Sequence, residues 1–502
     1  MRNAARAPAA RPDAGPAPWD LAVVGAGPAG MTAAVAAADA GCRVAVLDLG
    51  ERPGGQYWRW GPVTGDGRYH HGWPAFTALL RQFTAHQAAG RIGYSPGHAV
   101  FHVEPPAIDD AGSGHFRVHA VAHDRRRDYA AVQARAVVVA TGAYDRQLPV
   151  PGWTLPGVMA AGAAQALLKG SGVVAGRRVV VAGAGPFLLP VAAGLAGAGA
   201  TVVAVVEAGQ PLDYLRRPAG LAGSWRKLPE AGGYLAGLAR RRVPVLRRHA
   251  VIAAHGDGRL RSVTVARIDA AWAVVPGTER ALDADVLAAG YGFIPQVELL
   301  GEAGARLVAG AGPGALAALA GPDQQTTVPG LFAAGETTGV GGADLARIEG
   351  AAAGRAAARH AGHPVAAAGR GSRRERQARA SLTRFAAVME SVHAVQPGWT
   401  TWPDAETVIC RCEEVTLGEL RTAISLGADD TRSAKLLSRP GMGWCQGRMC
   451  GHAVSAIVAA AGGRPDGPGD VAGRPLAQPV PLRVLAALAG GSADGDPAGP
   501  VE

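Results

Sequence analysis

Two stretches of the chain share one layout, in which an apolar strand leads through a glycine-rich turn into a helix and a second apolar strand. They are residues 19–49, WDLAVVGAGPAGMTAAVAAADAGCRVAVLDL, and residues 176–209. Each has a G-x-G turn after the first strand and an acidic residue at the end of the second. This layout is typical of parallel α/β sheets that bind dinucleotides. The repeat therefore predicts an α/β chain with two Rossmann-like dinucleotide-binding domains.

The first unit has the residues that a bound dinucleotide requires. Gly25 allows the tight turn, Gly27 lets the backbone approach a pyrophosphate, and Gly30 lets the helix pack closely on the strand. The helix N-terminus offers free N–H groups to the phosphates. Asp48 ends the second strand, where its carboxylate can accept hydrogen bonds from an adenosine ribose. Gly55 follows in the stretch RPGGQYW and can bring the backbone close to a ligand.

The first unit alone suits either NAD or FAD, and two later segments favour FAD. Residues 136–153 form an apolar strand that ends in Thr141-Gly142, and residues 326–354 form a strand, a Gly335-Glu336 turn and a glycine-rich entry to a helix. The longer ribityl chain of a flavin needs additional contacts of this kind. The predicted FAD contacts are Gly25, Gly27, Pro28, Ala29, Gly30, Asp48, Gly55, Gln56, Thr141, Gly142, Gly335, Glu336 and Ala343.

The second unit keeps only part of the glycine pattern. Gly183 and Gly185 are present and Glu207 has the acidic position, but Leu188 stands where the third glycine is expected. Leucine can still pack the helix on the sheet, although less closely. We therefore predict a nucleotide-binding fold here and leave two alternatives open. The site binds NAD(P) through Gly183, Gly185 and Glu207, or its crevice is empty or has another use.

The composition argues against a nucleic-acid-binding protein and against a membrane-spanning protein. The net charge is +10, supplied almost wholly by arginine, and the chain has no interleaved aromatic pattern of a nucleic-acid-binding protein. Residues 179–206 carry no charge, but Pro186, Pro190 and several glycines interrupt them, so we predict buried strands rather than a membrane span. With no secretory signal and few cysteines, we predict a cytoplasmic protein with reduced thiols.

Four of the five cysteines lie together near the C-terminal end, whereas Cys42 is predicted to be a small buried apolar residue. Cys410, Cys412, Cys445 and Cys450 have the spacing C-x-C-x32-C-x4-C. Four thiolates can bind zinc or a [2Fe–2S] cluster. Structural zinc usually takes C-x2–4-C pairs, and the surrounding glycines leave backbone N–H groups free to point at sulfur. We therefore favour an iron–sulfur cluster, with zinc and free thiols as alternatives.

These motifs resemble known families. The three glycine segments resemble those of flavoproteins with two dinucleotide-binding domains, in which Asp usually occupies the position of Glu336. The cysteine block, with CRCEE and GMGxCQGRxC, resembles the bacterioferritin-associated-ferredoxin-like [2Fe–2S] domain. Residues 140–169, 285–300 and 474–486 are similar to the FAD-containing subunits of bacterial hydrogen cyanide synthase, opine oxidases and hydroxyproline and proline dehydrogenase complexes.

The resemblance implies an FAD- and [2Fe–2S]-containing electron-transfer subunit of a complex that oxidises the C–N bond of an amino acid, opine or imino acid. It implies that the partner is an amino-acid-oxidase-like FAD subunit, which carries most of the substrate site, and that a small ferredoxin-like subunit is a further candidate. A complex of this kind leaves peripheral membrane association open. Catalytic residues in this chain stay unknown. The alternatives are a self-sufficient NAD(P)H-dependent FAD and iron–sulfur reductase, and an iron-responsive [2Fe–2S] binding module.

The motifs also predict the domain bounds. We expect a disordered tail at 1–18, a discontinuous FAD-binding domain, a second dinucleotide-binding domain, a connecting helix within 366–400, a small helical cluster-binding domain and an extended C-terminal segment with a tail. The cluster-binding domain should contain one helix that stops at Gly427 and a second that begins near Ala434. The bounds of the other domains are 19–150 plus 281–365, 151–280, 401–465 and 466–502.

Overall fold

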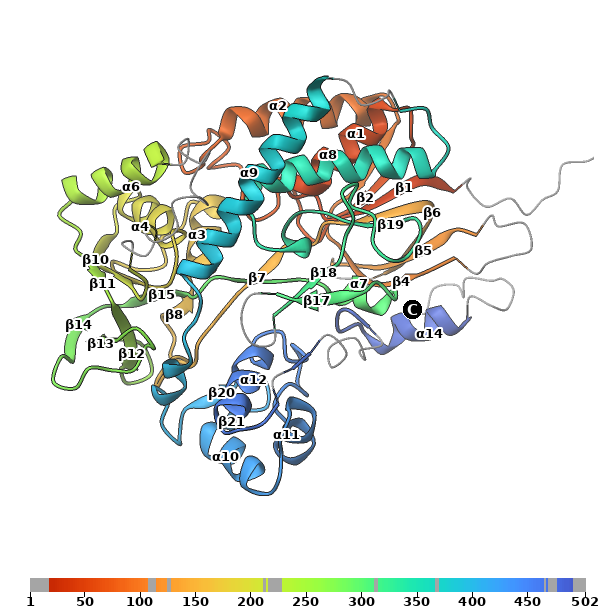
Figure 1. Ribbon diagram of the computed structural model, residues 1–502. Coiled ribbons are helices and arrows are strands. Elements are labelled where there is room, and N and C mark those ends of the chain that lie inside the picture. The colour runs from red at the N-terminus through yellow and green to blue at the C-terminus, as the bar shows by residue number, and fades with distance from the viewer. Residues whose placement is uncertain are drawn as a thin grey trace, which may run out of the picture.

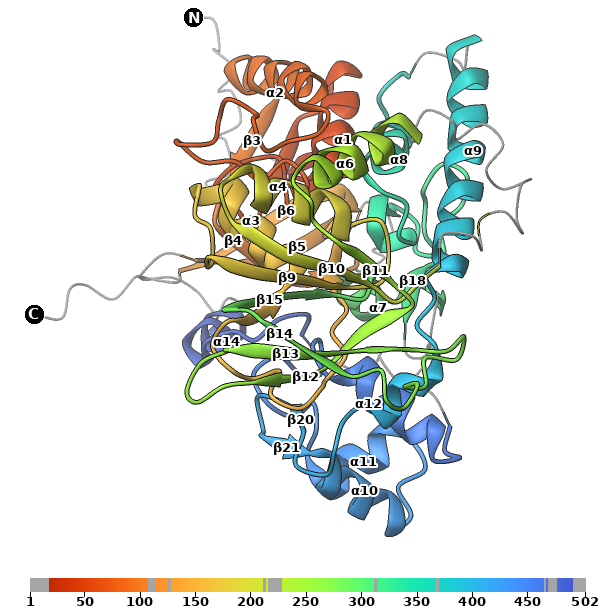
Figure 2. The same cartoon turned by 90° about the vertical axis from the view of Figure 1, so that its left-hand side faces the viewer.

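The chain forms two layered α/β halves and a small helical unit that lies below them in Figure 1. The computed structural model describes residues 18–106, 114–123, 128–210, 214, 228–310, 315–365, 370–464, 466–467 and 476–490. The predicted tail at 1–18 therefore lies almost entirely outside the described residues. Figure 2 shows the same arrangement from the side, with the helical unit again at one end.

The first half is built on a seven-stranded sheet. Side by side, its strands are β3 (Ile92–Ser95), β2 (Val44–Leu47), β1 (Trp19–Val24), β6 (Tyr129–Val139), β5 (Phe116–Ala122) and β4 (His98–Glu104), and β19 (Leu331–Ala333) also pairs with β6. The pairings of β1, β2, β3, β6 and β19 are parallel, whereas β4, β5 and β6 pair antiparallel. The central strands are buried on both faces, which explains their continuous apolar sequences.

Alternate residues of β1 face two different cores. Leu21 and Val23 pack on three helices, α1 (Pro28–Asp39), α2 (Trp73–Ala88) and α8 (Ala343–His360). Ala22 and Val24 face the other side, which α7 (Glu298–Glu302), β17 (Leu307–Ala309) and β18 (Leu316–Ala318) cover. The layered arrangement buries an apolar strand completely without leaving its backbone unpaired.

The second half repeats the plan on a five-stranded sheet whose pairings are all parallel. The strands are β11 (Val245–Arg247), β10 (Thr201–Glu207), β9 (Arg178–Gly183), β15 (Val286–Gly290) and β8 (Val158–Ala160). Helices α3 (Ala161–Ser171), α4 (Leu188–Gly197) and α6 (Leu228–Arg240) cover one face. The antiparallel sheet of β12 (His249–His255), β13 (Ser262–Arg267) and β14 (Arg280–Asp283) covers the other.

The second sheet is inserted into the chain between two strands of the first. After β6 the chain passes through β7 (Ala143–Asp145) to the second sheet, and it returns through β16 (Phe293–Pro295). Strands β7 and β16 pair antiparallel, so the outgoing and returning segments run side by side. The predicted bounds 19–150 plus 281–365 and 151–280 need one correction, because β14 and β15 lie in the second half. We therefore propose that the second domain extends from 151 to about Gly290 and that the first resumes after it.

Helices α1 and α8 cross at unusually close range. A Cβ built at Gly350 would lie 2.1 Å from the carbonyl oxygen of Ala29, and one at Gly354 would lie 2.2 Å from that of Ala33. The two pairs are each spaced four residues apart, so they stack along one face of each helix. Any side chain larger than hydrogen at these positions of α8 would push the helices apart.

The helical unit holds the four clustered cysteines, and we call residues 397–464 the cysteine unit. Its elements are η4 (Pro397–Thr401), β20 (Val408–Cys410), β21 (Val415–Thr416), α10 (Leu417–Ser425), α11 (Thr431–Ser438) and α12 (Gly451–Ala460). Thr416 with Glu419 and Asp430 with Ser433 form capping boxes at the starts of α10 and α11. Helix α11 thus begins at Thr431, earlier than the predicted start near Ala434.

The cysteine unit shares a hydrophobic core with the rest of the chain. Cys410 and Cys450 are buried together with Trp153 from the connection to the second sheet and with Trp272 and Tyr291. The indole nitrogen of Trp153 donates to the carbonyl of Val408 at 2.6 Å. The unit is therefore packed against the two halves and is not suspended on a linker.

Two further segments run along the outside. Helix α9 (Arg370–Val392) agrees with the predicted connecting helix and extends from α8 down to the second half (Figure 1). The predicted extended segment at the C-terminus is only partly correct. Ala477 pairs with Phe101, but the chain then forms helix α14 (Leu482–Gly490), which packs through Val484. Polar and proline residues before Leu482 concealed this short helix. Among the described helices, none is both long and apolar enough to cross a membrane.

The close helix crossing makes a prediction about stability. Gly350→Ala should destabilise the protein by about 1 to 3 kcal/mol, because the added methyl group would overlap the backbone of α1. The matched control is Gly237→Ala in α6, where an added Cβ meets no atom within 4 Å. It should leave stability unchanged or raise it slightly. Thermal unfolding of both variants measures the difference, and equal melting temperatures would show that α1 and α8 do not need the close contact.

Candidate functional site

The first glycine turn is fixed by packing on both sides. Gly25 has φ of 98°, in the region that favours glycine, and a Cβ there would lie 2.5 Å from the carbonyl oxygen of Ala140. A Cβ at Gly30 would lie 1.8 Å from the carbonyl oxygen of Gly25. These two glycines therefore hold the turn, the helix and the segment before Thr141 together.

Gly27 differs from Gly25 and Gly30 because a side chain at this position would meet no close neighbour. It is the N-cap of α1, and a Cβ there would have Gly55 as its nearest neighbour at 3.9 Å. Among the described residues no side chain caps this helix, and Pro28 and Ala29 occupy its first turn. The first N–H groups of a helix attract anions, so the surface in front of Gly27 can receive a phosphate. Gln56, the last predicted contact in this region, accepts a hydrogen bond from Arg59.

Asp48 lies beside the same turn, at the end of β2. Burial raises the pKa of its carboxyl group, and backbone hydrogen bonds from Ala26 and Gly50 oppose the rise. The hydroxyl of Tyr94 is 3.5 Å from Oδ2 of Asp48. The carboxylate is therefore held at the edge of the turn, in a position where it can accept hydrogen bonds from a ligand hydroxyl.

The third predicted segment meets the first at the crossing of α1 and α8. A Cβ at Gly335 would lie 2.9 Å from the Cβ of Ala29. Gly335 begins the short helix η3 (Gly335–Thr338), and Ala343 is the first residue of α8. Since Gly25 also contacts the backbone before Thr141, the structure brings all three predicted segments to one edge of the first sheet.

Glu336 occupies this edge in a way that its sequence position does not indicate. Its Oε1 accepts the N–H of Gly342 at 2.8 Å, at the start of α8. Burial raises the pKa of the Glu336 carboxyl to about 7. The longer side chain thus turns back to cap α8, and a contact with a ribityl chain stays a prediction.

Glu349 and Arg379 are two residues of this edge that the sequence did not single out. Oε2 of Glu349 accepts hydrogen bonds from the N–H of Gly335 and the hydroxyl of Thr338, each at 3.1 Å. Arg379 on α9 lies 3.6 Å from the other carboxylate oxygen. No motif marks these residues, because they act through packing between α8 and α9. They orient the turn that starts at Gly335.

In the second half, the chain itself satisfies the polar groups of the nucleotide crevice. The carboxylate of Glu207 accepts the N–H of Gly185 at 3.1 and 3.2 Å and the N–H of Gly209 at 2.8 Å. His393, just after α9, lies 3.5 Å from the same carboxylate, and its Nε2 lies 2.7 Å from the hydroxyl of Tyr214. These are the groups that a bound ribose would need.

The backbone of this crevice is also covered. A Cβ at Gly209 would lie 2.8 Å from Nδ1 of His393, and one at Gly185 would lie 3.8 Å from the same ring. A Cβ at Gly183 would lie 1.7 Å from the carbonyl oxygen of Gly290, so the backbone of Gly290 covers the other side of the turn. Leu188 begins α4 and is buried in the core of this half, which confirms that it packs the helix. The sequence could not reveal His393 because it lies more than 200 positions from the glycine turn.

The four cysteines converge in the cysteine unit although they come from two separated pairs. Cys410 ends β20 and is buried, Cys412 is exposed, and Cys445 and Cys450 lie in the loop before α12. A Cβ at Gly443 would lie 2.4 Å from that of Cys412, so the glycine allows the two pairs to approach.

Backbone N–H groups surround the sulfur atoms. The N–H of Gly441 donates to Sγ of Cys410 at 3.4 Å. Further backbone hydrogen bonds reach the sulfurs of Cys410, Cys412 and Cys445. They come from the N–H groups of Cys412, Glu413, Cys445, Gly447 and Met449. Donors of this kind stabilise sulfur that carries negative charge.

The thiols also contact one another. Hydrogen bonding from the Cys450 thiol lowers the pKa of Cys410 to about 6 and that of Cys445 to about 5, and it raises the pKa of Cys450 itself. Within the described part of the chain, no three His, Cys, Asp or Glu side chains are arranged to hold a single metal ion. A [2Fe–2S] cluster divides its four thiolates between two irons, so its ligands need not converge on one point. Two pairs of thiols in contact with one another fit this arrangement.

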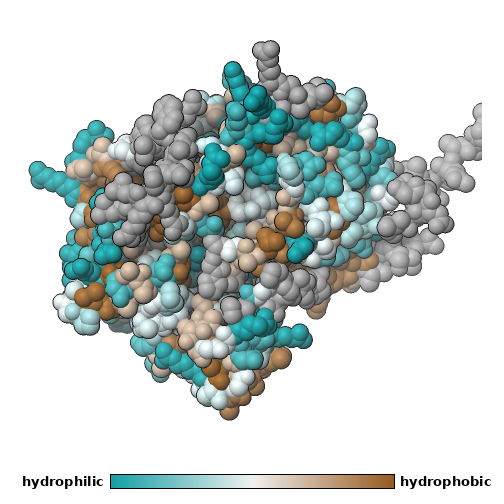
Figure 3. All heavy atoms as spheres, viewed as in Figure 1, coloured by the Kyte–Doolittle hydropathy of each residue, from teal (hydrophilic) through white to brown (hydrophobic). Residues whose placement is uncertain are grey.

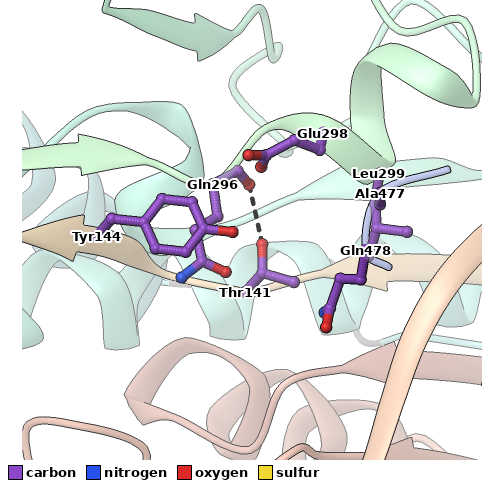
Figure 4. Close-up of a pocket in the computed structure, with 7 residues that line it drawn as sticks. All are labelled: Thr141, Tyr144, Gln296, Glu298, Leu299, Ala477 and Gln478. Carbon is purple, nitrogen blue, oxygen red and sulfur yellow. Dashed lines mark hydrogen bonds between the residues drawn. The ribbon is translucent and has the colours of Figure 1, made fainter. Parts of the chain in front are cut away.

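A narrow cleft lies between the segments around β7 and α7 and the C-terminal segment at 477–478. Thr141, Tyr144, Gln296, Glu298, Leu299, Ala477 and Gln478 line it (Figure 4). The hydroxyl of Thr141 donates to the carbonyl of Gln296 at 2.9 Å. A larger hollow of about 290 Å³ lies on the outer surface at α4 and α6, and Arg240 and Arg241 line it away from both candidate sites.

Two further residues lie outside these sites. Cys42 is fully buried in the core of the first half, as predicted, and burial raises the pKa of its thiol to about 12. His70, which precedes His71 in the sequence, packs on Trp73, and its Nε2 lies 2.5 Å from the carbonyl of Arg59. Burial lowers the pKa of His70, which keeps it neutral at physiological pH. The contacts of Cys42 and His70 therefore indicate a role in packing for both residues.

Comparison with known proteins assigns the two halves to one family and the cysteine unit to another. Residues 19–361 match the family described as pyridine nucleotide-disulphide oxidoreductase, and residues 408–460 match the BFD-like [2Fe-2S] binding domain. The chain is 34% identical to the A subunit of opine oxidase from Agrobacterium tumefaciens (strain Ach5) over 94% of its own length and 91% of that protein. It is 33% identical to hydrogen cyanide synthase subunit HcnB of Pseudomonas aeruginosa over 88% and 93% of the respective lengths.

A solved structure supports the fold. L-proline dehydrogenase from P. horikoshii superposes with a TM-score of 0.63 over 93% of this chain and 79% of that one, at 18% identity. The family match over the two halves implies FAD as a cofactor, and the match over the cysteine unit implies a [2Fe–2S] cluster. The open face at Gly27 and the N–H groups around the sulfurs fit these two groups.

The geometry at Gly27 gives a direct test for the nucleotide. Gly27→Leu should fold normally, because its backbone conformation suits any residue and an added Cβ has no neighbour closer than 3.9 Å. The side chain should nevertheless fill the space in front of α1 and give protein that contains the cluster but little FAD. Gly197→Leu is the matched control, since its Cβ also has open space, in the second half. Stoichiometric FAD in Gly27→Leu, measured after denaturation, would place the cofactor elsewhere.

Proposed function

Since the chain belongs to the pyridine nucleotide-disulphide oxidoreductase family and carries a BFD-like [2Fe–2S] domain, we propose that it is the electron-transfer subunit of a multi-subunit dehydrogenase or oxidase. The enzyme would act on the C–N bond of an amino acid, opine or imino acid, as the likeness to the A subunit of opine oxidase suggests. One observation supports this most strongly. One chain holds a flavin-type nucleotide site and a four-cysteine site, and the pair of Arg448 with Glu298 joins the cysteine unit to the first half.

The proposed FAD site uses the three segments at the edge of the first sheet. The turn from Gly25 to Gly30 would hold the pyrophosphate at the N-terminus of α1, and Asp48 would accept hydrogen bonds from the adenosine ribose. The backbone from Gly335 to Ala343 would approach the ribityl chain, with Glu349 fixing the turn. Bound there, FAD supplies two-electron chemistry and the cluster supplies one-electron transfer.

The proposed cluster ligands are the thiolates of Cys410, Cys412, Cys445 and Cys450. Their two pairs match the two irons of the cluster, and the backbone N–H groups around them would stabilise its sulfur atoms. Burial of Cys410 and Cys450 shields one side, whereas Cys412 is exposed. Cys412 therefore faces the solvent side, from which a partner can approach.

The contacts in the second half argue against a self-sufficient NAD(P)H-dependent reductase. Glu207 already has Gly185, Gly209 and His393 as partners, and the His393 ring covers the glycine turn. A nicotinamide nucleotide would have to displace His393 and take over the buried carboxylate of Glu207, which is costly because buried polar groups need new partners. An iron-responsive binding module is also disfavoured, since it would have no use for the family fold over residues 19–361.

The proposal includes partners. The relatives that match along most of the chain are themselves subunits, of opine oxidase and of hydrogen cyanide synthase. We propose that an amino-acid-oxidase-like FAD subunit binds the substrate, and that a small ferredoxin-like subunit is a further component. A stable assembly of this kind needs an interface on the order of 2,000 Å² or more.

The cluster prediction is tested by analysis of the purified chain. Anaerobically prepared protein should contain about two iron and two acid-labile sulfide per chain, the content of one [2Fe–2S] cluster. Cys450→Ser should lose the cluster and keep FAD, because the segments proposed to bind FAD lie in the first half. Cys42→Ser is the control and should keep both cofactors. Stoichiometric zinc in place of iron, without visible absorption, would contradict the assignment.

The function itself is tested by dye reduction with a panel of amino acids, opines and cyclic imino acids. The isolated chain should show no substrate-dependent turnover, and activity should appear when an amino-acid-oxidase-like subunit is co-expressed and co-purified. Anaerobic mixing of the isolated chain with NADH or NADPH should leave the flavin oxidised. Turnover of an amine by the isolated chain, or rapid flavin bleaching by NADH, would replace this proposal with a self-contained enzyme.

A further inference from the structure

A buried ion pair connects the cysteine loop to the first half of the molecule. Arg448 lies between Cys445 and Cys450 in the sequence, and its Nε is 3.2 Å from Oε1 of Glu298. The two side chains are only 8% and 12% exposed. A second guanidinium nitrogen of Arg448 donates to the carbonyl of Cys445 at 3.1 Å. A single side chain thus contacts the cysteine loop and an element outside the cysteine unit.

Glu298 is in turn linked to a predicted FAD segment. It is the first residue of α7, where a carboxylate is favoured by the helix dipole. Two residues earlier, Gln296 accepts the hydroxyl of Thr141 with its carbonyl and donates its N–H to the carbonyl of Gly142, each at 2.9 Å. Figure 4 shows Thr141 and Glu298 lining the same cleft. A continuous set of contacts therefore runs from the loop of Cys445 to Thr141.

A second polar contact supports the same interface. Nε2 of His452, near the start of α12, lies 2.7 Å from the carbonyl of Gln147. A carbonyl oxygen can only accept, so the ring nitrogen donates this hydrogen bond. Gln147 lies two residues after the end of β7, on the connection that leaves the first half. The apolar core alone would tolerate sliding, whereas buried polar partners are satisfied in one register only.

The ion pair is better suited to fixing an orientation than to raising stability. Desolvation of two charges offsets most of their attraction, so a buried pair often adds little net stability. It does specify geometry, because a displaced Arg448 would leave Glu298 buried without this partner. The flavin-side segment and the cysteine loop are the two parts whose separation matters for electron transfer.

We propose that Arg448 and Glu298 are positioning residues that hold the cysteine loop at a fixed separation from the Thr141–Gly142 segment, and so set the rate of electron transfer between flavin and cluster. The inference rests on the proposed function, in which both cofactors work within this chain. The step moves one electron, so the flavin is oxidised by one electron and the cluster is reduced by one. No bond to the protein forms or breaks.

The test uses the full chain with both cofactors and a photochemical one-electron donor that reduces the flavin under anaerobic conditions. Cluster reduction is followed by visible absorption, and the reduced cluster is recorded by electron paramagnetic resonance. Arg448→Gln and Glu298→Gln should each slow electron transfer from flavin to cluster about tenfold or more, because a small displacement of the reacting groups has a large effect on rate. Iron, sulfide and FAD contents should stay at wild-type levels.

Two comparisons separate positioning from general damage. The double variant should be no slower than the slower single variant, since both changes remove one contact. The matched control is Arg439→Gln, which breaks the exposed pair of Arg439 with Glu413 in the same unit and should leave the rate unchanged. Arg448→Lys should recover part of the rate because it keeps the charge.

The outcomes distinguish this inference from the proposed function. If the wild-type chain passes no electrons from flavin to cluster, the proposed function fails. If the wild type transfers electrons and Glu298→Gln, which lies outside the cysteine loop, does so at the same rate, the positioning inference is overturned. Loss of the cluster in Arg448→Gln with a normal rate in Glu298→Gln would likewise overturn it, and would assign Arg448 to construction of the cluster site.

Discussion

The near-contact of helices α1 and α8 determines most of the remaining geometry. Glycines at positions 350 and 354 let the two backbones approach until only hydrogen fits between them. This contact brings Ala29, in the first turn of α1, against Gly335, and so joins two segments that are more than 300 residues apart. The edge where they meet is the part of the first sheet that can hold an extended cofactor.

The two halves of the molecule have one plan and different uses. In the first half the surface in front of Gly27 is open and its phosphate-binding groups are available. In the second half Glu207 accepts the N–H groups of Gly185 and Gly209, and His393 lies against it while contacting Tyr214. The second half instead supports the connection on which the cysteine unit packs. We therefore propose that the duplicated nucleotide-binding fold serves in one copy as a site and in the other as a scaffold.

Local patterns in the sequence predicted the parts of this structure that depend on neighbouring residues. The glycine turns, the alternating strands and helices, and the four clustered cysteines were all apparent, because each pattern depends on residues that are close in the sequence.

Contacts between distant elements could not be predicted. His393 at Glu207, Arg379 at Glu349 and Arg448 at Glu298 carry no motif and depend on how the elements pack. The same limit applies to Glu336, whose backbone position was correctly identified while its side chain turns to cap α8. It applies also to Leu426 and Leu436 of the cysteine unit, which are apolar but 72% and 73% exposed. Figure 3 shows apolar surface at the lower end of the molecule, where this unit lies.

The shared core between the cysteine unit and the second half connects metal supply to the integrity of the whole chain. Cys410 and Cys450 are part of the same apolar interior as Trp153 and Tyr291, so the sulfurs are packing atoms as well as the ligands we propose. A chain that matures without iron would keep buried thiols in place of bound thiolates and would lose the bridge between its two cysteine pairs. Its interior would then be looser and more accessible to proteases. Iron starvation would therefore lower the amount of flavoprotein in the cell, without any dedicated regulator.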